Sequence, residues 1–186
     1  QVEGAAIGSA RLEFRPGTVM AGDYTFRVGT AGSTTLVLQT VLPALLLADG
    51  ESNLTLEGGT HNPFAPPWDF LAKCYLPLIN RMGPCVETTL VRPGFYPAGG
   101  GQFTVRVQPA RQLGRLKLLE RGEVRSRRVR AIVANLPLHI AERECRAIAK
   151  KTGWEDTCFS PEEVFDSRGP GNVVLIELER LYNHLN

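Results

Sequence analysis

The sequence has no long apolar stretch and no visible export signal. Its longest apolar run, from Leu36 to Ala48, has 13 residues and is interrupted by two polar residues and a proline, whereas a membrane-spanning helix needs about 20 apolar residues. The N-terminus has neither a basic segment nor the apolar segment that follows one in a signal peptide. We therefore expect no contact with a membrane.

The sequence is also poor in cysteine and histidine. The four cysteines lie 11, 60 and 13 positions apart, which fits neither a CxxC metal knuckle nor the dense framework of a small secreted domain. The three histidines are isolated, and no histidine or cysteine pair has the three- or four-residue spacing of a metal cage. We therefore predict reduced thiols and a cytoplasmic location.

What is present is the composition of an ordinary globular protein. The chain has 186 residues, of which 43% are apolar and 22% charged, so one or two domains are expected and disorder is excluded. The net charge of +2 hides a gradient, with −1 over 1–110, +7 over 111–150 and −4 over 151–186. A basic block attracts a phosphate backbone, but on charge alone an arginine-rich strand face in water is the simpler explanation.

Alternation of apolar and polar residues predicts five strands in the first part of the chain, over 11–15, 24–28, 53–57, 86–91 and 103–107. Residues 35–48, apolar on nearly every side, predict a buried helix that Ser33 or Thr34 caps and Pro43 bends.

A second helix is predicted to begin near Pro66, because consecutive prolines favour the first helical turn. Its core stripe is predicted to consist of Leu71, Tyr75, Leu78 and Met82. Residues 24–107 then follow the order strand, helix, strand, helix, strand, strand, and such a unit buries one sheet face beneath two helices.

Beyond Pro109 the pattern predicts a second, smaller α/β unit. A basic strand region over 115–134 precedes a helix over 138–151, which Gly153 can close. A short helix is expected to open at Ser160 and a last strand to run over 173–179.

Three glycine-rich or polar stretches are candidates for chemistry, and each has a structural alternative. Residues 29–34 could hold an anion at a helix start or cap a buried helix, and the GK[ST] ending of a P-loop is absent. Residues 58–70 could offer a flat surface for a base or staple a helix N-terminus. Residues 94–101 could let a ligand approach the backbone or form a plain hairpin loop. Gln39 must find a partner or face a site, because burying its amide unpaired costs ~1 to 3 kcal/mol.

Taken together, these stretches resemble the RNA 3′-terminal phosphate cyclases. The resemblance rests on GTAGSTTLVLQTVLP at 29–43, GGTHNP at 58–63 with APP at 65–67, and GFYPAGGG at 94–101. It implies an α+β fold with βαβαββ repeats of the cyclase and enolpyruvyl-transferase type and a small inserted α/β domain. On this basis residues 1–117 form the core with a full repeat at 24–107, 118–179 form the insert, and 180–186 are a tail.

The resemblance also implies an activity. Members use ATP to adenylylate a histidine, pass the AMP to an RNA 3′-phosphate and let the neighbouring 2′-hydroxyl displace it, which gives a 2′,3′-cyclic phosphate. The implied cofactors are ATP and a divalent metal, Mg or Mn, and the implied partner is RNA with a 3′-phosphate end. Exposed sheet edges and apolar helix faces would favour association, with a homodimer as one outcome.

Several residues match positions of the family's nucleotide site. Gln39 matches a glutamine near the ATP phosphates and the metal, Pro66 a proline that packs on the adenine, and Phe70 an aromatic residue beside it. Asn62, Ser33 and Thr34 are adjacent and are included as candidates for cofactor binding.

Two family segments have no match in these 186 residues. They are the N-terminal Glu-Gly-Gly-Gly-Gln segment and the segment with the nucleotidylated histidine, so no catalytic residue is assigned and the chain alone is expected to be inactive and to bind nucleotide weakly. His184 is followed by leucine, as that histidine is, but it comes directly after the insert. The alternatives are a non-catalytic RNA-binding or ribosome-assembly scaffold and, less favoured by the motifs, an enolpyruvyl transferase.

Overall fold

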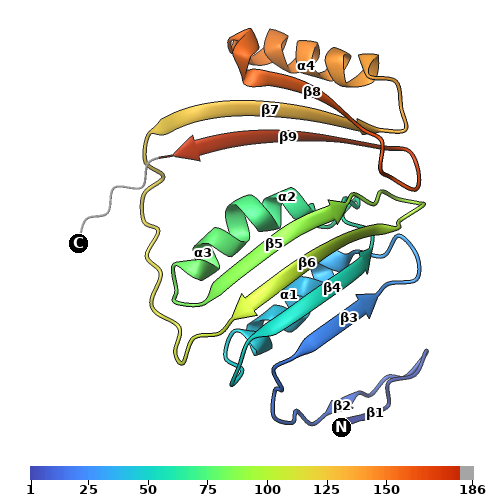
Figure 1. Cartoon of the computed structure of the whole chain (residues 1–186), viewed down its shortest axis with the longest axis vertical. Helices are drawn as coiled ribbons and strands as arrows, with labels where there is room; N and C mark the ends of the chain where they lie inside the picture. The colour runs from blue at the N-terminus through green and yellow to red at the C-terminus, as the bar shows by residue number, and fades with distance from the viewer. Residues whose placement is uncertain (181–186) are drawn as a thin grey trace.

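The computed structural model describes residues 1–180, which form a four-stranded and a three-stranded sheet that lie one above the other, and a two-stranded N-terminal hairpin (Figure 1). His184 and most of the tail lie outside the described residues. The core elements are β3 (Asp23–Arg27), α1 (Thr34–Leu45), β4 (Ser52–Gly58), α2 (Trp68–Phe70), η1 (Leu71–Tyr75), α3 (Leu76–Asn80), β5 (Cys85–Arg92) and β6 (Gly101–Gln108). The remaining elements are β1 (Val2–Glu3), β2 (Glu13–Phe14), β7 (Val124–Ala134), α4 (His139–Thr152), η2 (Asp156–Cys158), β8 (Phe159–Val164) and β9 (Gly171–Arg180).

The core sheet has the strand order β3-β4-β6-β5. β3 and β4 are parallel, and α1 is the crossover that parallel neighbours require. β6 pairs antiparallel with both β4 and β5. The predicted order of strand, helix, strand, helix, strand, strand is therefore confirmed, and with it the α+β class.

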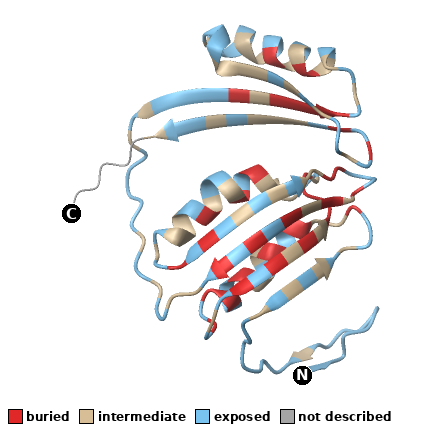
Figure 2. Ribbon diagram, in the orientation of Figure 1, coloured by how far each residue is buried: buried red, intermediate tan, exposed pale blue. Residues whose placement is uncertain are grey.

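One face of the core sheet carries the hydrophobic core. Alternate residues of β4 and β6, among them Leu54, Leu56 and Phe103, are fully buried against Leu38 and Leu42 of α1. Figure 2 shows these buried positions alternating with exposed ones along each strand, as expected for a sheet with one face in water. The inward direction predicted for these strand residues is confirmed.

The second core helix has a different buried stripe from the predicted one. Leu71 and Leu76 are buried, whereas Tyr75 and Leu78 are only partly buried. The cause is a π-helical turn, in which the Leu76 N–H donates to the carbonyl of Leu71 five residues earlier and so moves every later side chain around the axis. Pro77 has no N–H, so the ordinary helical bond at that position is missing as well.

The second sheet has the order β8-β7-β9, with β7 parallel to β8 and antiparallel to β9. α4 covers one face, where Ala131 and Val133 pack against Ala141 and Cys145. Gly153 ends α4 in the left-handed conformation with φ 66°, as its position in the sequence predicts.

Two expectations for this part of the chain are wrong. The helix expected to open at Ser160 is strand β8, because Pro161 lies in an edge strand that can do without its N–H and pairs with Ala131 of β7. The basic strand begins at Val124, not at 115, since residues 109–123 form a connection without helix or strand.

The N-terminal residues form only a small hairpin of β1 and β2. The strand expected over 11–15 is reduced to Glu13–Phe14, and both Leu12 and Phe14 are exposed. Within the described residues, no helix combines the length and the apolar character that crossing a bilayer would take.

Candidate functional site

The three glycine-rich stretches meet at the carboxyl ends of β3 and β4. The Gly59 N–H donates to the Gly32 carbonyl at 2.9 Å, and the Thr60 N–H donates to the Gly94 carbonyl at 2.9 Å. Stretches 29–34, 58–60 and 94–101, which are separate in the sequence, therefore form one junction. In open α/β sheets ligands bind beyond the carboxyl ends of the strands, so this junction is the candidate site.

Glycine is required at the junction because backbones approach closely there. A Cβ on Gly94 would lie 2.3 Å from the Gly101 nitrogen, and one on Gly59 would lie 2.4 Å from the Ala31 carbonyl oxygen. These separations are shorter than any ordinary van der Waals contact. The loop over 94–101 is thus a close backbone crossing and not merely a tolerant hairpin.

The start of α1 lies inside this junction. The Ser33 hydroxyl accepts a hydrogen bond from the Leu36 N–H at 3.3 Å, which makes Ser33 the N-cap. The Thr34 hydroxyl is buried and donates to the Gly59 carbonyl at 2.6 Å. The predicted cap is confirmed for Ser33, whereas the Thr34 hydroxyl links the helix to the glycine-rich stretch at Gly59.

Asn62 contributes the most unusual polar atom of the junction. Its side-chain N–H donates to the Ala31 carbonyl, while its Oδ1 atom is buried. Within residues 1–180, Oδ1 is the one buried side-chain polar atom that has no hydrogen-bond partner. Such an orphaned acceptor costs ~1 to 3 kcal/mol, so a donor from a ligand or water would stabilise this position.

A buried network of polar and charged side chains connects the junction to the second sheet, β8-β7-β9. The Thr60 hydroxyl and His61 Nδ1 are 2.8 Å apart, and His61 Nε2 lies 3.0 Å from the Asp69 carboxylate. Arg130 of β7 then donates to Asp69 at 3.0 Å and to both carboxylate oxygens of Glu162 at 2.8 and 2.7 Å. These contacts link Thr60 at the junction to Glu162 of β8 without a break.

The charges of this network set the pKa values of Asp69 and Glu162. Burial raises the pKa of Asp69, but the hydrogen bond from His61 and the electrostatic attraction of His61 and Arg130 outweigh it, and the pKa is lowered. The bidentate hydrogen bond of Arg130 lowers the pKa of Glu162. Sequence spacing did not reveal this network, because its members come from four separate segments. From the sequence alone, Asp69 is recognised only as a residue that suits the start of a helix.

The predicted nucleotide residues divide into two groups. Ser33, Thr34 and Asn62 lie together in the junction. Gln39 is in the second turn of α1, partly buried, and no residue of the described chain forms a hydrogen bond with its side chain.

The other two predicted residues lie at the start of the second helix. Pro66 is partly buried just before α2, and Phe70 at the end of α2 is 46% exposed. No hydrogen bond or ring contact within residues 1–180 joins either of them to Gln39. A common nucleotide pocket for the three therefore stays a prediction.

A divalent metal does not fit the described residues alone. Mg²⁺ takes about six oxygen ligands in near-octahedral geometry. Gln39 offers a single amide oxygen, and residues 1–180 contain no group of three or more histidine, cysteine, aspartate or glutamate side chains placed to hold a metal. The described residues alone therefore do not complete a magnesium site.

Comparison with known proteins identifies the family of this chain. Residues 1–174 match the family model "RNA 3′-terminal phosphate cyclase". The RNA 3′-terminal phosphate cyclase of Koribacter versatilis (strain Ellin345) is 51% identical over 178 residues, which are 96% of this chain and 50% of that protein. The one of Ectopseudomonas mendocina (strain ymp) is 47% identical over 176 residues, 95% of this chain and 51% of that protein. The chain thus spans about half the length of these relatives, and it belongs to the RNA 3′-terminal phosphate cyclase family.

Proposed function

We propose that the chain forms part of a cytoplasmic, ATP-dependent enzyme that converts an RNA 3′-phosphate into a 2′,3′-cyclic phosphate. The printed names of its relatives support the reaction class. The observation that carries the proposal is the glycine junction at the start of α1, where the helix dipole favours an anion such as a nucleotide phosphate.

The chemistry proposed is activation of a leaving group. The bond between the α- and β-phosphates of ATP breaks, pyrophosphate leaves, and the AMP group passes through a histidine to the terminal phosphate, which becomes an anhydride. The adjacent 2′-oxygen then forms a bond to phosphorus while the bond to AMP breaks, and its proton leaves with water. Because the 2′-oxygen is held beside the phosphate in the same nucleotide, the second step needs little more than activation.

The residues of this chain would bind and orient the nucleotide. Gln39 has an amide with no partner in residues 1–180, and Phe70 exposes a ring, so both are free to contact a ligand. Pro66 would pack on the adenine, and Asn62 would offer its orphaned Oδ1 to a donor. Ser33 would cap the start of α1 beside the phosphates.

The test uses the intact gene product, α-labelled ATP and an RNA with a 3′-phosphate. We expect transfer of label to the protein and an RNA end that resists phosphatase and periodate. Gln39→Ala is expected to lower label transfer at least tenfold, whereas Gln112→Ala, which replaces an exposed glutamine between the two sheets, leaves it unchanged.

Two outcomes would contradict the proposal. The first is RNA binding without any label transfer from ATP, which is the behaviour of a non-catalytic scaffold. The second is an equal effect of Gln39→Ala and Gln112→Ala, which would remove Gln39 from the nucleotide site. For the 186-residue chain alone we expect weak ATP binding by calorimetry and no label transfer.

A further inference from the structure

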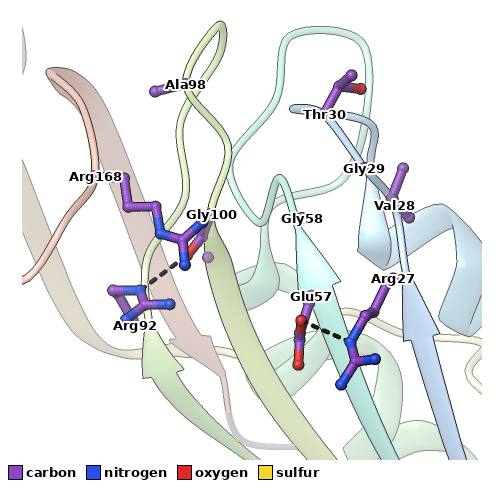
Figure 3. A pocket seen from close by; sticks show the side chains of 11 residues that line it. Arg27, Val28, Gly29, Thr30, Glu57, Gly58, Arg92, Ala98, Gly100 and Arg168 are labelled. Carbon is purple, nitrogen blue, oxygen red and sulfur yellow. Dashed lines mark hydrogen bonds and ion pairs between the residues drawn. The ribbon is translucent and has the colours of Figure 1, made fainter.

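A hollow opens at the junction itself, on the face of the core sheet that carries no helix, and part of its lining comes from the stretches 29–34, 58–60 and 94–101. It has a volume of about 220 Å³, and its charged lining consists of Arg27, Arg92, Arg168 and Glu57. Figure 3 shows Arg92 and Arg168 on one side of the hollow and Arg27 with Glu57 on the other. None of the residues predicted to bind the nucleotide lines it.

The hollow has an excess of positive charge. Arg27 pairs with Glu57 at 3.2 Å, which is the sole carboxylate in the lining. Arg92 uses only its Nε, in a 2.8 Å hydrogen bond to the Gly100 carbonyl. Arg168 has no hydrogen bond or ion pair with any described residue. Two guanidinium groups therefore lie on one side without an anion in residues 1–180 to neutralise them.

The position of Arg168 is fixed by the backbone, although its charged end is exposed. A Cβ on Gly100 would lie 2.2 Å from Arg168 Cδ, so the arginine stem crosses directly over that glycine. The following residues press on the same loop, since a Cβ on Gly169 would lie 2.4 Å from the Ala98 Cβ. The segment after β8 thus places the positively charged side chain of Arg168 beside the core sheet.

The lining indicates which part of a ligand would bind. Its apolar side chains are only those of Val28 and Ala98, and it contains no aromatic ring. Bases are held by stacking on rings, whereas arginines with their planar donor groups match phosphate oxygens. The chemistry therefore fits a phosphate and not a base or a whole nucleotide.

We propose that Arg27, Arg92 and Arg168 bind a phosphodiester group of the RNA backbone, away from the 3′-terminal phosphate that reacts. The proposal rests on the proposed function, because it takes RNA as the substrate. A backbone contact positions a strand without reading its sequence, so this site would hold substrates of many sequences in the same way.

The test measures binding of a fluorescent single-stranded RNA with a 3′-hydroxyl end, without ATP, at several salt concentrations. Arg168→Gln and Arg27→Gln are each expected to weaken binding roughly two- to fivefold. Each is also expected to lower the slope of log K against log salt by about 0.7, the value for one phosphate contact with a single strand. Glu57→Gln removes the competing carboxylate and is expected to strengthen binding, a change that loss of folding cannot produce.

Arg106→Gln is the matched control, since Arg106 is an exposed arginine of the same sheet that also pairs with a carboxylate, Glu51, outside the hollow. The proposal is overturned if Arg106→Gln weakens binding as much as Arg168→Gln, if neither hollow variant changes RNA binding, or if the hollow variants weaken ATP binding instead. Label transfer from ATP, measured in parallel on the intact gene product, tests the proposed function separately. Arginine-dependent RNA binding without label transfer would refute that function and leave the site standing.

Discussion

Replacing Arg130 by methionine removes the cation that lies between Asp69 at the junction and Glu162 of β8. Both carboxylates accept hydrogen bonds from the guanidinium, at 2.7 to 3.0 Å. Methionine keeps much of the apolar stem, so the main change is the loss of charge. Asp69 then keeps only its bond to His61, and Glu162 loses a bidentate partner.

The magnitude follows from the burial of the three groups. Removal of one partner from a fully buried ion pair costs about 3 to 5 kcal/mol. The side chain of Asp69 is 8% exposed, but those of Arg130 and Glu162 are 19% and 27% exposed, so water will compensate part of the loss. We expect Arg130→Met to lower the free energy of unfolding by about 2 to 4 kcal/mol.

Urea unfolding with two fluorescent reporters is the assay. The chain has two tryptophans, of which Trp68 starts α2 and Trp154 follows α4, so single-tryptophan variants report on each sheet separately. Arg128→Met is the control on the same strand. The Arg128 side chain is 57% exposed, and its ion pair with Glu162 is long, at 4.0 Å. Its expected cost is below about 0.5 kcal/mol.

The effect has a predictable pH dependence. The folded protein lowers the pKa values of Asp69 and Glu162, so their stabilisation is present above the pKa values of the unfolded chain and is lost as the pH falls through the folded values. The difference between the wild type and Arg130→Met should be constant above about pH 5 and shrink in stronger acid. A cost equal to that of Arg128→Met, or one that grows as the pH falls, would refute this account.

Two further substitutions test the packing. Gly171→Ala would place a Cβ 2.0 Å from the buried Phe95 ring, and we expect a loss of about 1 to 3 kcal/mol in urea unfolding, whereas Gly17→Ala has open space and should change little. Ser33→Ala removes the cap that the Leu36 N–H uses and should cost about 0.5 to 2 kcal/mol; an unchanged midpoint would mean that the cap is not needed.

Much of the fold could be predicted because its signals are local. The alternation in β4 and β6 reflects burial of one side of each strand, and Leu54 and Leu56 are buried as expected. The apolar run of α1 predicts a helix buried on all sides, but only one side of it is buried, and Leu36 is 45% exposed. The α4 region begins and ends within one residue of the prediction, because Gly153 is a local stop signal.

The predictions fail where residues distant in the sequence determine the local structure. Ser160 and the residues after it have the letters of a helix start, but pairing with β7 makes them a strand. The π-helical turn before Pro77 shifts the buried stripe, and a regular 3.6-residue period cannot anticipate it.

The candidate site shows the same division. Ser33 was predictable as a cap from its neighbours. The contact between Asp69 and Arg130, and the arrival of Arg168 beside Arg92, join residues that are far apart in the chain. A single sequence shows no periodicity that links such positions.

The close fit between loop 94–101 and the segment after β8 also restricts how the protein can change. Gly100 lies under Arg168, Gly171 lies against Phe95, and neither glycine has room for a methyl group. A larger residue in one segment therefore requires a compensating change in the other. A chimera that takes one segment from a relative with bulkier residues at these points would have to take the other from the same relative.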